Sequence, residues 1–210
     1  MTPGSAPSRS ARIIKYTHAC VRIEHGGTVL VIDPGIWSEP SALHGADAVL
    51  ITHEHADHID VLRLAGLGVP VYAPAAARIS GLDVIPVTSS ASFTAAGFSV
   101  TAVGVRHAPI YGDEPDCANY GYLIDDRIYH PGDALVVPDQ PVQTLFVPLQ
   151  ASWLKTAEAI SFLRAVQPER AFGIHDAQIN SRGRQAINSW LTDQGGYGYR
   201  YLPPGESADR

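Results

Sequence analysis

Short apolar segments with the patterning of β-strands run through the first half of the chain. Residues 20–24 alternate apolar and polar positions, and Gly26 and Gly27 form a turn into the apolar run 28–32, which together predict a hairpin. Residues 48–51 are continuously apolar and predict a buried strand. The strands expected in this half are 13–16, 20–24, 28–32, 48–51 and 69–72, and a short helix is expected from Ile59.

The second half repeats this strand-rich pattern and then becomes helical. Apolar residues recur at three-residue spacing in 155–166, before Pro168, and gather on one face of 181–194, so both segments are predicted helices. The strands expected here are 98–105, 120–124, 127–129, 144–147 and 170–174. Two strand-rich halves that are each followed by helices predict a sandwich of two sheets with helices on the outside.

The composition is that of a single folded domain. The chain has 210 residues, of which 45% are apolar and 17% are charged, and this is enough for one domain with a substantial core. Residues 1–11 are rich in Ser, Pro and Gly and lack apolar periodicity, so we expect a mobile leader followed by one domain over 12–210.

Charge and cysteine content narrow the class of protein. The formal charge is −6 and no run of Lys or Arg is present, which disfavours a nucleic-acid partner. Cys20 and Cys117 are too far apart for a CxxC pair, so we expect buried thiols in a reducing compartment. No apolar stretch reaches the roughly 20 residues that span a bilayer, and the N-terminus lacks the apolar core of a signal peptide, so a cytoplasmic location without membrane contact is expected.

One segment concentrates groups that bind metals. His53-Glu54-His55-Ala56-Asp57-His58 places three imidazoles and a carboxylate directly after the buried strand 48–51. Imidazole and carboxylate are common ligands of zinc and other first-row divalent ions. A solvated surface loop does not explain why these side chains are placed side by side, so the segment predicts a metal site.

Three further ligand-capable residues follow predicted strands. His107 follows 98–105, Asp133 follows 127–129 through a Pro-Gly turn, and His175 directly follows 170–174. Loops at strand ends are held by a rigid scaffold and can aim such groups at one point. The seven candidate ligands are His53, His55, Asp57, His58, His107, Asp133 and His175, which is enough for two metals. A metal pair needs a shared carboxylate, and Asp133 is the natural bridge.

The order His53-x-His55-x-Asp57-His58, then His107, Asp133 and His175, resembles the metallo-β-lactamase superfamily over nearly the whole chain. The resemblance implies an α/β fold, a four-layer αβ/βα sandwich with metals at one edge of the two sheets. It also implies a division of the ligands. His53, His55 and His107 would hold the first metal, Asp57, His58 and His175 the second, and Asp133 both.

Within that superfamily the chain is most similar to one branch of small hydrolases. The stretches Asp33-Pro34-Gly35, Tyr129-His130-Pro131-Gly132-Asp133 and Ile174-His175-Asp176 carry this likeness. They resemble the hydrolases grouped with the ascorbate-phosphate lactonase-like branch.

The ligand set predicts the mechanism of a hydrolase. Two divalent ions lower the pKa of a bridging water, so that hydroxide can attack a carbonyl carbon or a phosphorus. Asp57 or Asp133 would accept the water proton, which makes these two the predicted catalytic groups. Zinc is the expected metal because the site is rich in imidazole, and Mn, Fe or Ni could bind the same set.

Several functions remain open at this stage. A small ester, lactone or phosphoester is the expected substrate, and a small nuclease or cyclic-nucleotide phosphodiesterase is the alternative enzyme. The 35 residues after His175 leave no room for the helical domain of a glyoxalase II-like thioesterase. A flavodiiron-type oxidoreductase would have Glu in place of His55. A metal-binding sensor or scaffold without turnover is the alternative of another class, and a homo-oligomer is possible.

The remaining polar residues have two interpretations each. Asp33 is either a turn residue or a support for a metal-bound histidine. His18 and Tyr111 could line the cleft, and Lys155 could meet an anionic substrate or only begin a helix. Asp176 and His130 compete with His175 for the last ligand position, and Asp176 could instead orient an imidazole.

Overall fold

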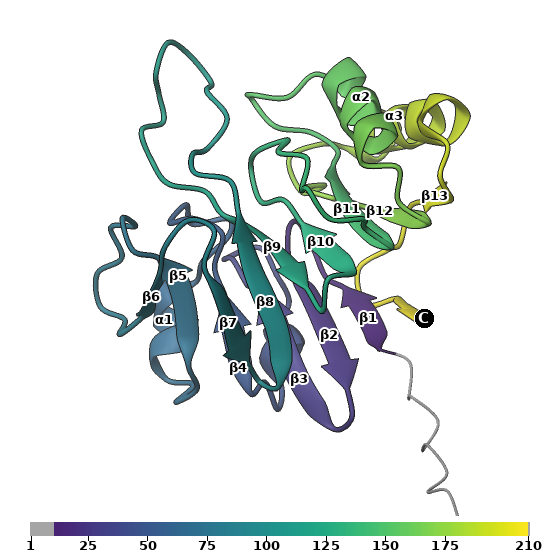
Figure 1. The fold of residues 1–210 in the computed structure, drawn as a ribbon. Coiled ribbons are helices and arrows are strands. Elements are labelled where there is room, and N and C mark those ends of the chain that lie inside the picture. Colours follow the sequence, from purple (N-terminus) through teal and green to yellow (C-terminus); the bar gives the residue numbers. More distant parts are fainter. Residues whose placement is uncertain (1–10, 210) are drawn as a thin grey trace, which may run out of the picture.

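The chain folds into two stacked β-sheets of seven strands each, as Figure 1 shows for the computed structural model, which describes residues 11–209. The predicted leader, residues 1–11, lies outside the described residues except for Ala11, which is buried in the core. The two halves of the sequence each supply most of one sheet. The predicted sandwich of two sheets is therefore confirmed.

The first sheet combines an N-terminal meander with parallel strands. Its strand order is β14-β1-β2-β3-β4-β5-β6. β1 to β3 are antiparallel neighbours, whereas β3 to β6 run parallel. The strands are β1 (Arg12–Lys15), β2 (Val21–His25), β3 (Thr28–Ile32), β4 (Ala48–Leu50), β5 (Val71–Pro74), β6 (Ile85–Val87) and β14 (Ser207–Asp209). β1 thus lies between β2 and the last strand of the chain.

The second sheet repeats this plan. Its strand order is β13-β12-β11-β10-β9-β8-β7, with antiparallel pairs from β7 to β10 and parallel pairs from β10 to β13. The strands are β7 (Ser92–Ala95), β8 (Phe98–Val103), β9 (Gly121–Ile124), β10 (Ile128–His130), β11 (Thr144–Pro148), β12 (Arg170–Ile174) and β13 (Tyr199–Arg200). Both sheets therefore carry their parallel strands toward one end of the strand order.

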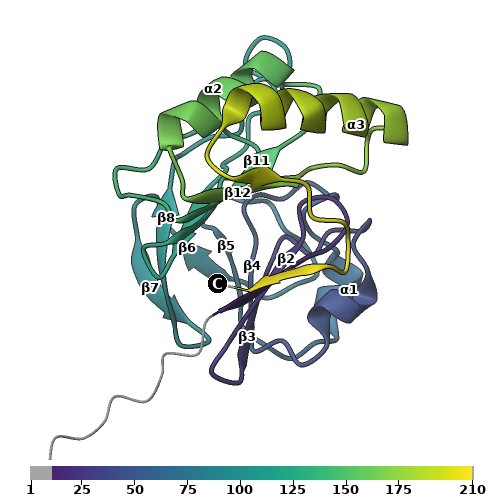
Figure 2. The same cartoon turned by 90° about the vertical axis from the view of Figure 1, so that its right-hand side faces the viewer.

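Helices cover the outer face of each sheet and make four layers (Figure 2). The first sheet is covered by the 3₁₀-helix η1 (Pro40–Leu43) and by α1 (Val61–Ala65), and the second by α2 (Thr156–Val166) and α3 (Ser181–Trp190). One apolar core fills the space between the sheets and a further one lies under each helical layer. Within residues 11–209, no helix combines the length and apolarity that crossing a bilayer requires.

The elements that the sequence did not predict are short and lie at sheet edges. β6 contains Pro86, β7 is half polar, and β13 and β14 are two and three residues long. An edge strand has fewer buried positions than a central strand, so its sequence shows little apolar periodicity. The predicted helix over 181–194 ends at Trp190 and continues as a wider π-helical turn, η2 (Leu191–Gly195).

Candidate metal centre

The strands place the candidate ligands at one edge of the sandwich. β3 and β4 run parallel in the first sheet, and β10 and β12 run in one direction in the second, so their carboxyl ends share an edge. Asp33 follows β3, His53 follows β4, Asp133 follows β10 and His175 follows β12. Residues that are 142 positions apart in sequence thereby meet, with Asp33 and His175 at the two extremes of this set.

Three histidines form a first group of donor atoms. His53, His55 and His107 each offer a ring nitrogen, and these atoms all lie within 4.8 Å of one another. His53 Nε2 lies 3.1 Å from His55 Nδ1, and the His107 ring is 5.0 Å from His53 and 4.9 Å from His55 between centroids. This is the set expected for the first metal.

A second group of donor atoms includes His58 itself. His18, Asp57, His58 and His175 offer donor atoms within 4.8 Å of one another. His175 Nε2 lies 3.7 Å and His58 Nε2 3.9 Å from Asp57 Oδ2. These include the three residues expected for the second metal, with His18 in addition.

Asp133 lies between the two groups. Its Oδ1 is 3.2 Å from His58 Nε2, while its Oδ2 is 3.2 Å from His175 Nε2 and 3.4 Å from His107 Nε2. Trp153 also donates its indole N–H to Oδ2 at 2.9 Å. The carboxylate therefore contacts members of both groups, as a bridging ligand would.

Four of the histidines expose the same ring nitrogen to the cluster because the other nitrogen donates elsewhere. His58 Nδ1 donates to Asp33 at 2.7 Å, His107 Nδ1 to the Ala108 carbonyl at 2.6 Å, and His175 Nδ1 to the Gln150 carbonyl at 2.5 Å. Such bonds fix the tautomer, so Nε2 keeps a free lone pair in the neutral ring, which is the form that binds metals.

His53 is held in the same way through a threonine. Thr52 Oγ1 donates to Asp33 Oδ2 at 2.7 Å, so it accepts from His53 Nδ1 at 3.0 Å. The Thr52 backbone N–H donates to the other oxygen of Asp33 at 2.8 Å. Asp33 thus orients two histidines, His58 directly and His53 through Thr52, and this geometry favours its support role over simple turn formation.

His18 has the opposite tautomer. Its Nδ1 accepts from the Ala177 backbone N–H at 3.3 Å, so Nε2 carries the proton and donates to Asp57 Oδ2 at 3.0 Å. Both ring nitrogens of His130 are also hydrogen-bonded, since Nδ1 accepts the Gly132 N–H and Nε2 donates to the Ala19 carbonyl. His18 therefore orients the Asp57 carboxylate, and His130 braces the backbone.

Buried polar atoms with no hydrogen-bond partner converge at the centre of the cluster. Among residues 11–209, His58 Nε2, His175 Nε2 and Asp133 Oδ1 are buried and lack such a partner. A buried polar atom left unsatisfied costs about 1–3 kcal/mol. A cation placed among these atoms would satisfy all three, so the donor set fits a metal.

The electrostatics of the cluster favour a positive charge at its centre. Burial alone would lower the pKa of His58, but Asp133 and Asp33 raise this pKa well above its usual value, so without a metal the ring carries a proton that a bound metal ion would displace from Nε2. Burial would raise the pKa of Asp133, yet His175 and His58 hold it well below its usual value, so the carboxylate is ionised. Burial lowers the pKa of His53 well below its usual value and keeps that ring neutral.

A buried ion pair supports the histidine that orients Asp57. Lys15 and Asp176 are both buried and form a salt bridge. Asp176 Oδ1 accepts the His18 backbone N–H at 2.9 Å, and Oδ2 accepts the Tyr201 hydroxyl at 2.8 Å. Asp176 therefore does not join the donor groups, and it acts on the site through the position of His18.

Two of the predicted substrate residues make no direct contact with the donor groups. Tyr111 is 88% exposed in the loop after His107, where its backbone pairs with Glu114. The Lys155 ammonium is exposed and lies 4.0 Å from Glu158, and its backbone N–H donates to the same carboxylate at the start of α2. The geometry of Lys155 is that of a helix-entry residue.

Several contacts of the site left little or no signal in the sequence. Asn119 Oδ1 accepts the Asp133 backbone N–H at 2.9 Å while its amide donates to the Pro131 carbonyl, and no motif in the sequence marks this asparagine. Thr52 could be suspected from the sequence alone, because it directly precedes the candidate ligand His53. The indole bond of Trp153 to Asp133 crosses 20 positions and needed the fold to be seen.

Gly35 allows two loops to approach closely. A Cβ at this position would lie 1.9 Å from the Asp57 backbone oxygen. The backbone N–H of the following residue, Ile36, donates to the Ala56 carbonyl at 2.9 Å. We expect Gly35→Ala to displace the loop 53–58, which carries four of the candidate ligands, and to destabilise the fold by about 1–3 kcal/mol. Urea unfolding and metal content measure the two effects.

Gly66→Ala is the matched control for that change. Gly66 has a helical backbone with φ −91°, and a Cβ there meets nothing within 4 Å. It should leave both stability and metal content near wild type. Equal effects of the two substitutions would contradict the close approach at Gly35.

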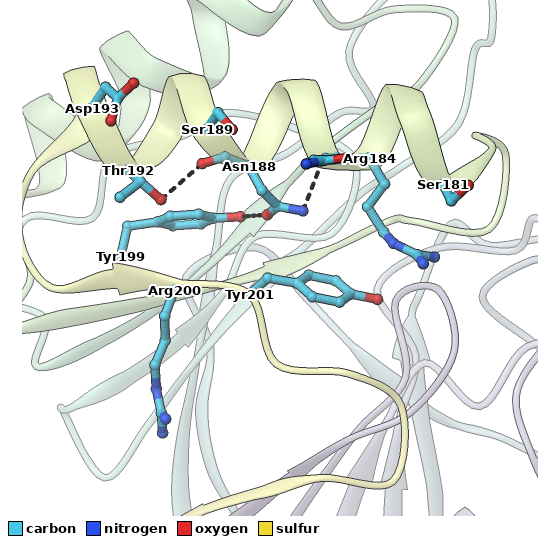
Figure 3. Close-up of a pocket in the computed structure, with 10 residues that line it drawn as sticks. Ser181, Arg184, Asn188, Ser189, Thr192, Asp193, Tyr199, Arg200 and Tyr201 are labelled. Atoms are coloured by element: carbon cyan, nitrogen blue, oxygen red, sulfur yellow. Dashed lines mark hydrogen bonds between the residues drawn. The ribbon is translucent and has the colours of Figure 1, made fainter.

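A cavity of about 620 Å³ lies away from the cluster, between α3 and β13 (Figure 3). Some of its polar groups bond with one another, since the Tyr199 hydroxyl donates to Asn188, whose amide donates to the Arg184 carbonyl at 2.8 Å. Asp193 is its one acidic lining residue and no histidine lines it. This cavity therefore has no metal-binding chemistry, although Tyr201 on its wall reaches Asp176.

Comparison with known proteins gives the same fold and a family. The model of the Beta-lactamase superfamily domain matches residues 12–175. Protein Rv0786c of Mycobacterium tuberculosis is 37% identical over 204 residues, covering 91% of this chain and 96% of that protein. A UPF0173 metal-dependent hydrolase of Enterococcus faecalis is 28% identical over 78% of this chain and 85% of its own length. Igni18, a metallo hydrolase of Ignicoccus hospitalis, superposes with a TM-score of 0.73 at 17% identity, covering 96% of this chain and 98% of that structure.

Proposed function

We propose that this chain, which belongs to the metallo-β-lactamase superfamily and is one of its metal-dependent hydrolases, binds two divalent ions and cleaves a small ester, lactone or phosphoester. The observation that supports this most is the shared tautomer of His53, His58, His107 and His175. Each ring donates from Nδ1 and turns Nε2 toward Asp133 and its surroundings.

The arrangement of donors supports two ions in preference to one. The first group contains only imidazoles, while the second contains Asp57, and Asp133 contacts both groups from its two oxygens. Zinc suits this donor set, and Mn, Fe and Ni share its preference for imidazole. When bound, such a pair supplies a hydroxide at neutral pH and polarises the bond under attack.

The protein's own groups position the reactants and manage the proton. Asp57 and Asp133 are the proposed proton acceptors, because both are ionised at neutral pH and keep free lone pairs. Burial would raise the pKa of Asp57, but its bond with His18 lowers it to about 2. His18 and Trp153 each donate to one of these carboxylates and so hold it in a fixed orientation.

Metal removal tests the metal part of the proposal. Protein stripped with a chelator should take up two equivalents of zinc, measured by elemental analysis after dialysis. Zinc at 100 times the dissociation constant of each site should stabilise the fold by about 2.7 kcal/mol per bound ion, or about 5.4 kcal/mol for two ions, seen as a higher melting temperature. Uptake of one equivalent would refute the pair, and no uptake would refute the metal centre.

Activity tests the hydrolytic part. The zinc-loaded protein should hydrolyse chromogenic esters, lactones or phosphodiesters, and the chelated protein should not. A protein that holds two zinc ions and turns over none of these would be a sensor or scaffold. A preference for cyclic nucleotides or short nucleic acids over all small esters would instead establish the phosphodiesterase alternative.

A further inference from the structure

Apolar side chains are exposed on the rim of the second donor group. Trp37 packs edge-on against the His18 ring, with 4.8 Å between centroids, and remains 42% exposed. Its neighbour Ile36 is 49% exposed and is tied to the metal-binding loop through the Ala56 carbonyl. An exposed aromatic side chain thus lies against the histidine that orients Asp57, and an exposed isoleucine precedes it in the chain.

The loop after His107 brings a second apolar element to the same edge. Figure 1 shows this long loop between β8 and β9 extending beyond the ends of the strands. Its base is fixed to the site, since the Ala108 N–H donates to the Asp133 carbonyl at 2.8 Å. Its tip carries Ile110, which is 51% exposed, and the exposed Tyr111. The loop therefore presents apolar surface from the side of the first donor group.

Three cations that lie close in sequence to residues of the site have carboxylate partners. Arg106 next to His107 binds the Asp113 carbonyl and lies 3.4 Å from Asp116. Lys15 is buried against Asp176, and Lys155 faces Glu158. Lys15 is therefore not free to meet a substrate anion, whereas Arg106 and Lys155 are exposed and form only surface pairs.

Glu54 adds a negative charge to the metal-binding loop itself. It follows His53 directly, and its Oε2 is buried with no hydrogen-bond partner among the described residues. A carboxylate in this position repels a second anion and does not affect a neutral molecule. Together with the buried pairing of Lys15, it disfavours binding of phosphate groups outside the metals.

We propose that the substrate is a neutral ester or lactone with an apolar chain or ring, which Trp37, Ile36, Ile110 and Tyr111 cover while the reacting bond lies over the metal cluster. This inference rests on the proposed hydrolytic function and narrows its substrate class. Burial of one methylene group is worth roughly a fourfold gain in affinity. Chain length should therefore control the rate through these four side chains.

The first test is the rate on esters of increasing length. For the zinc-loaded enzyme, kcat/KM should rise at least about tenfold from p-nitrophenyl acetate to p-nitrophenyl hexanoate, which is the gain expected if about two of the four added methylene groups are buried, and bis(p-nitrophenyl) phosphate should be the poorest substrate. Trp37→Ala should flatten the rise, and Trp37→Phe should restore part of it. Trp190→Ala is the control, because Trp190 is 57% exposed on α3 and should not matter.

A second variant guards against a local folding defect at Trp37. Ile110→Ser with Tyr111→Ser changes only exposed side chains of the loop tip and should also flatten the length dependence. Metal content and melting temperature identify variants that remain folded. A flat dependence in the wild type, or a steep one that survives in both variants, would overturn the proposal, as would a preference for the phosphodiester.

Binding separates this inference from the proposed function. Calorimetry with the zinc-loaded protein should show hexanamide binding at least tenfold more tightly than acetamide and than diethyl phosphate, with the gain lost in Trp37→Ala. If no ester is hydrolysed but this pattern holds, the hydrolytic function fails and the apolar site stands. If esters are hydrolysed but hexanamide binds no better than acetamide, the function stands and the apolar site fails.

Discussion

Asp133→Ala should lower hydrolysis by at least about a thousandfold, which corresponds to about 4 kcal/mol of transition-state stabilisation. The carboxylate contacts His58, His107 and His175 within 3.4 Å, so its removal takes away the group that joins the two donor sets. Metal content should fall below two equivalents for the same reason. Steady-state kinetics and elemental analysis of the purified variant measure both effects.

Two companion variants make this result specific. Asp139→Ala removes an exposed carboxylate from the same connection between β10 and β11 and should behave as wild type. Asp133→Asn keeps the shape of the side chain and the acceptor for Trp153 but removes the charge, and it should lose metal as the alanine variant does. Full activity of Asp133→Ala in an active preparation would refute the bridging role.

Lys15→Met should destabilise the fold by about 3–5 kcal/mol, because it leaves Asp176 as a buried charge without its ammonium partner. Methionine fills a similar volume, so the loss measures charge and not packing. Since Asp176 also accepts the His18 backbone N–H, activity should fall as well. Urea unfolding of the metal-free protein isolates the stability effect from metal binding.

The control and the reciprocal change identify the ion pair as the cause. Lys155→Met removes an exposed ammonium 4.0 Å from Glu158 and should change stability by less than about 1 kcal/mol. Adding Asp176→Asn to Lys15→Met should recover part of the lost stability, because no unpaired charge then stays buried. A double variant that is less stable than Lys15→Met alone would contradict this explanation.

Patterning predicted the strands that form the centres of the sheets. The run 28–32 and the run 170–174 became β3 and β12 with the same bounds, because buried strands need apolar residues at nearly every position. The edge strand β14 carries Ser-Ala-Asp and pairs with β1 across the length of the chain. Its pairing depends on the path of the C-terminal segment, which no local pattern encodes.

The ligands could be predicted from the sequence, but the groups that orient them could not. His53, His55, Asp57 and His58 lie within one short segment, and strand ends identified the others. By contrast, the role of His18 depends on which of its ring nitrogens accepts the Ala177 backbone N–H. That hydrogen bond joins residues 159 positions apart. Chemistry is visible in residue type and spacing, whereas tautomers and ion pairs require the folded geometry.

The pairing of β1 with β14 has a consequence for how the protein is made. β1 leads directly to Lys15 and His18, and the Lys15 backbone bonds with Gly205 and Glu206 just before β14. During translation these residues leave the ribosome about 190 positions after Lys15 has emerged. The first sheet can gain its edge strand β14 only after residue 209 has emerged. Until then, β1 lacks one of its two neighbouring strands, and the backbone bonds of Lys15 to Gly205 and Glu206 cannot form.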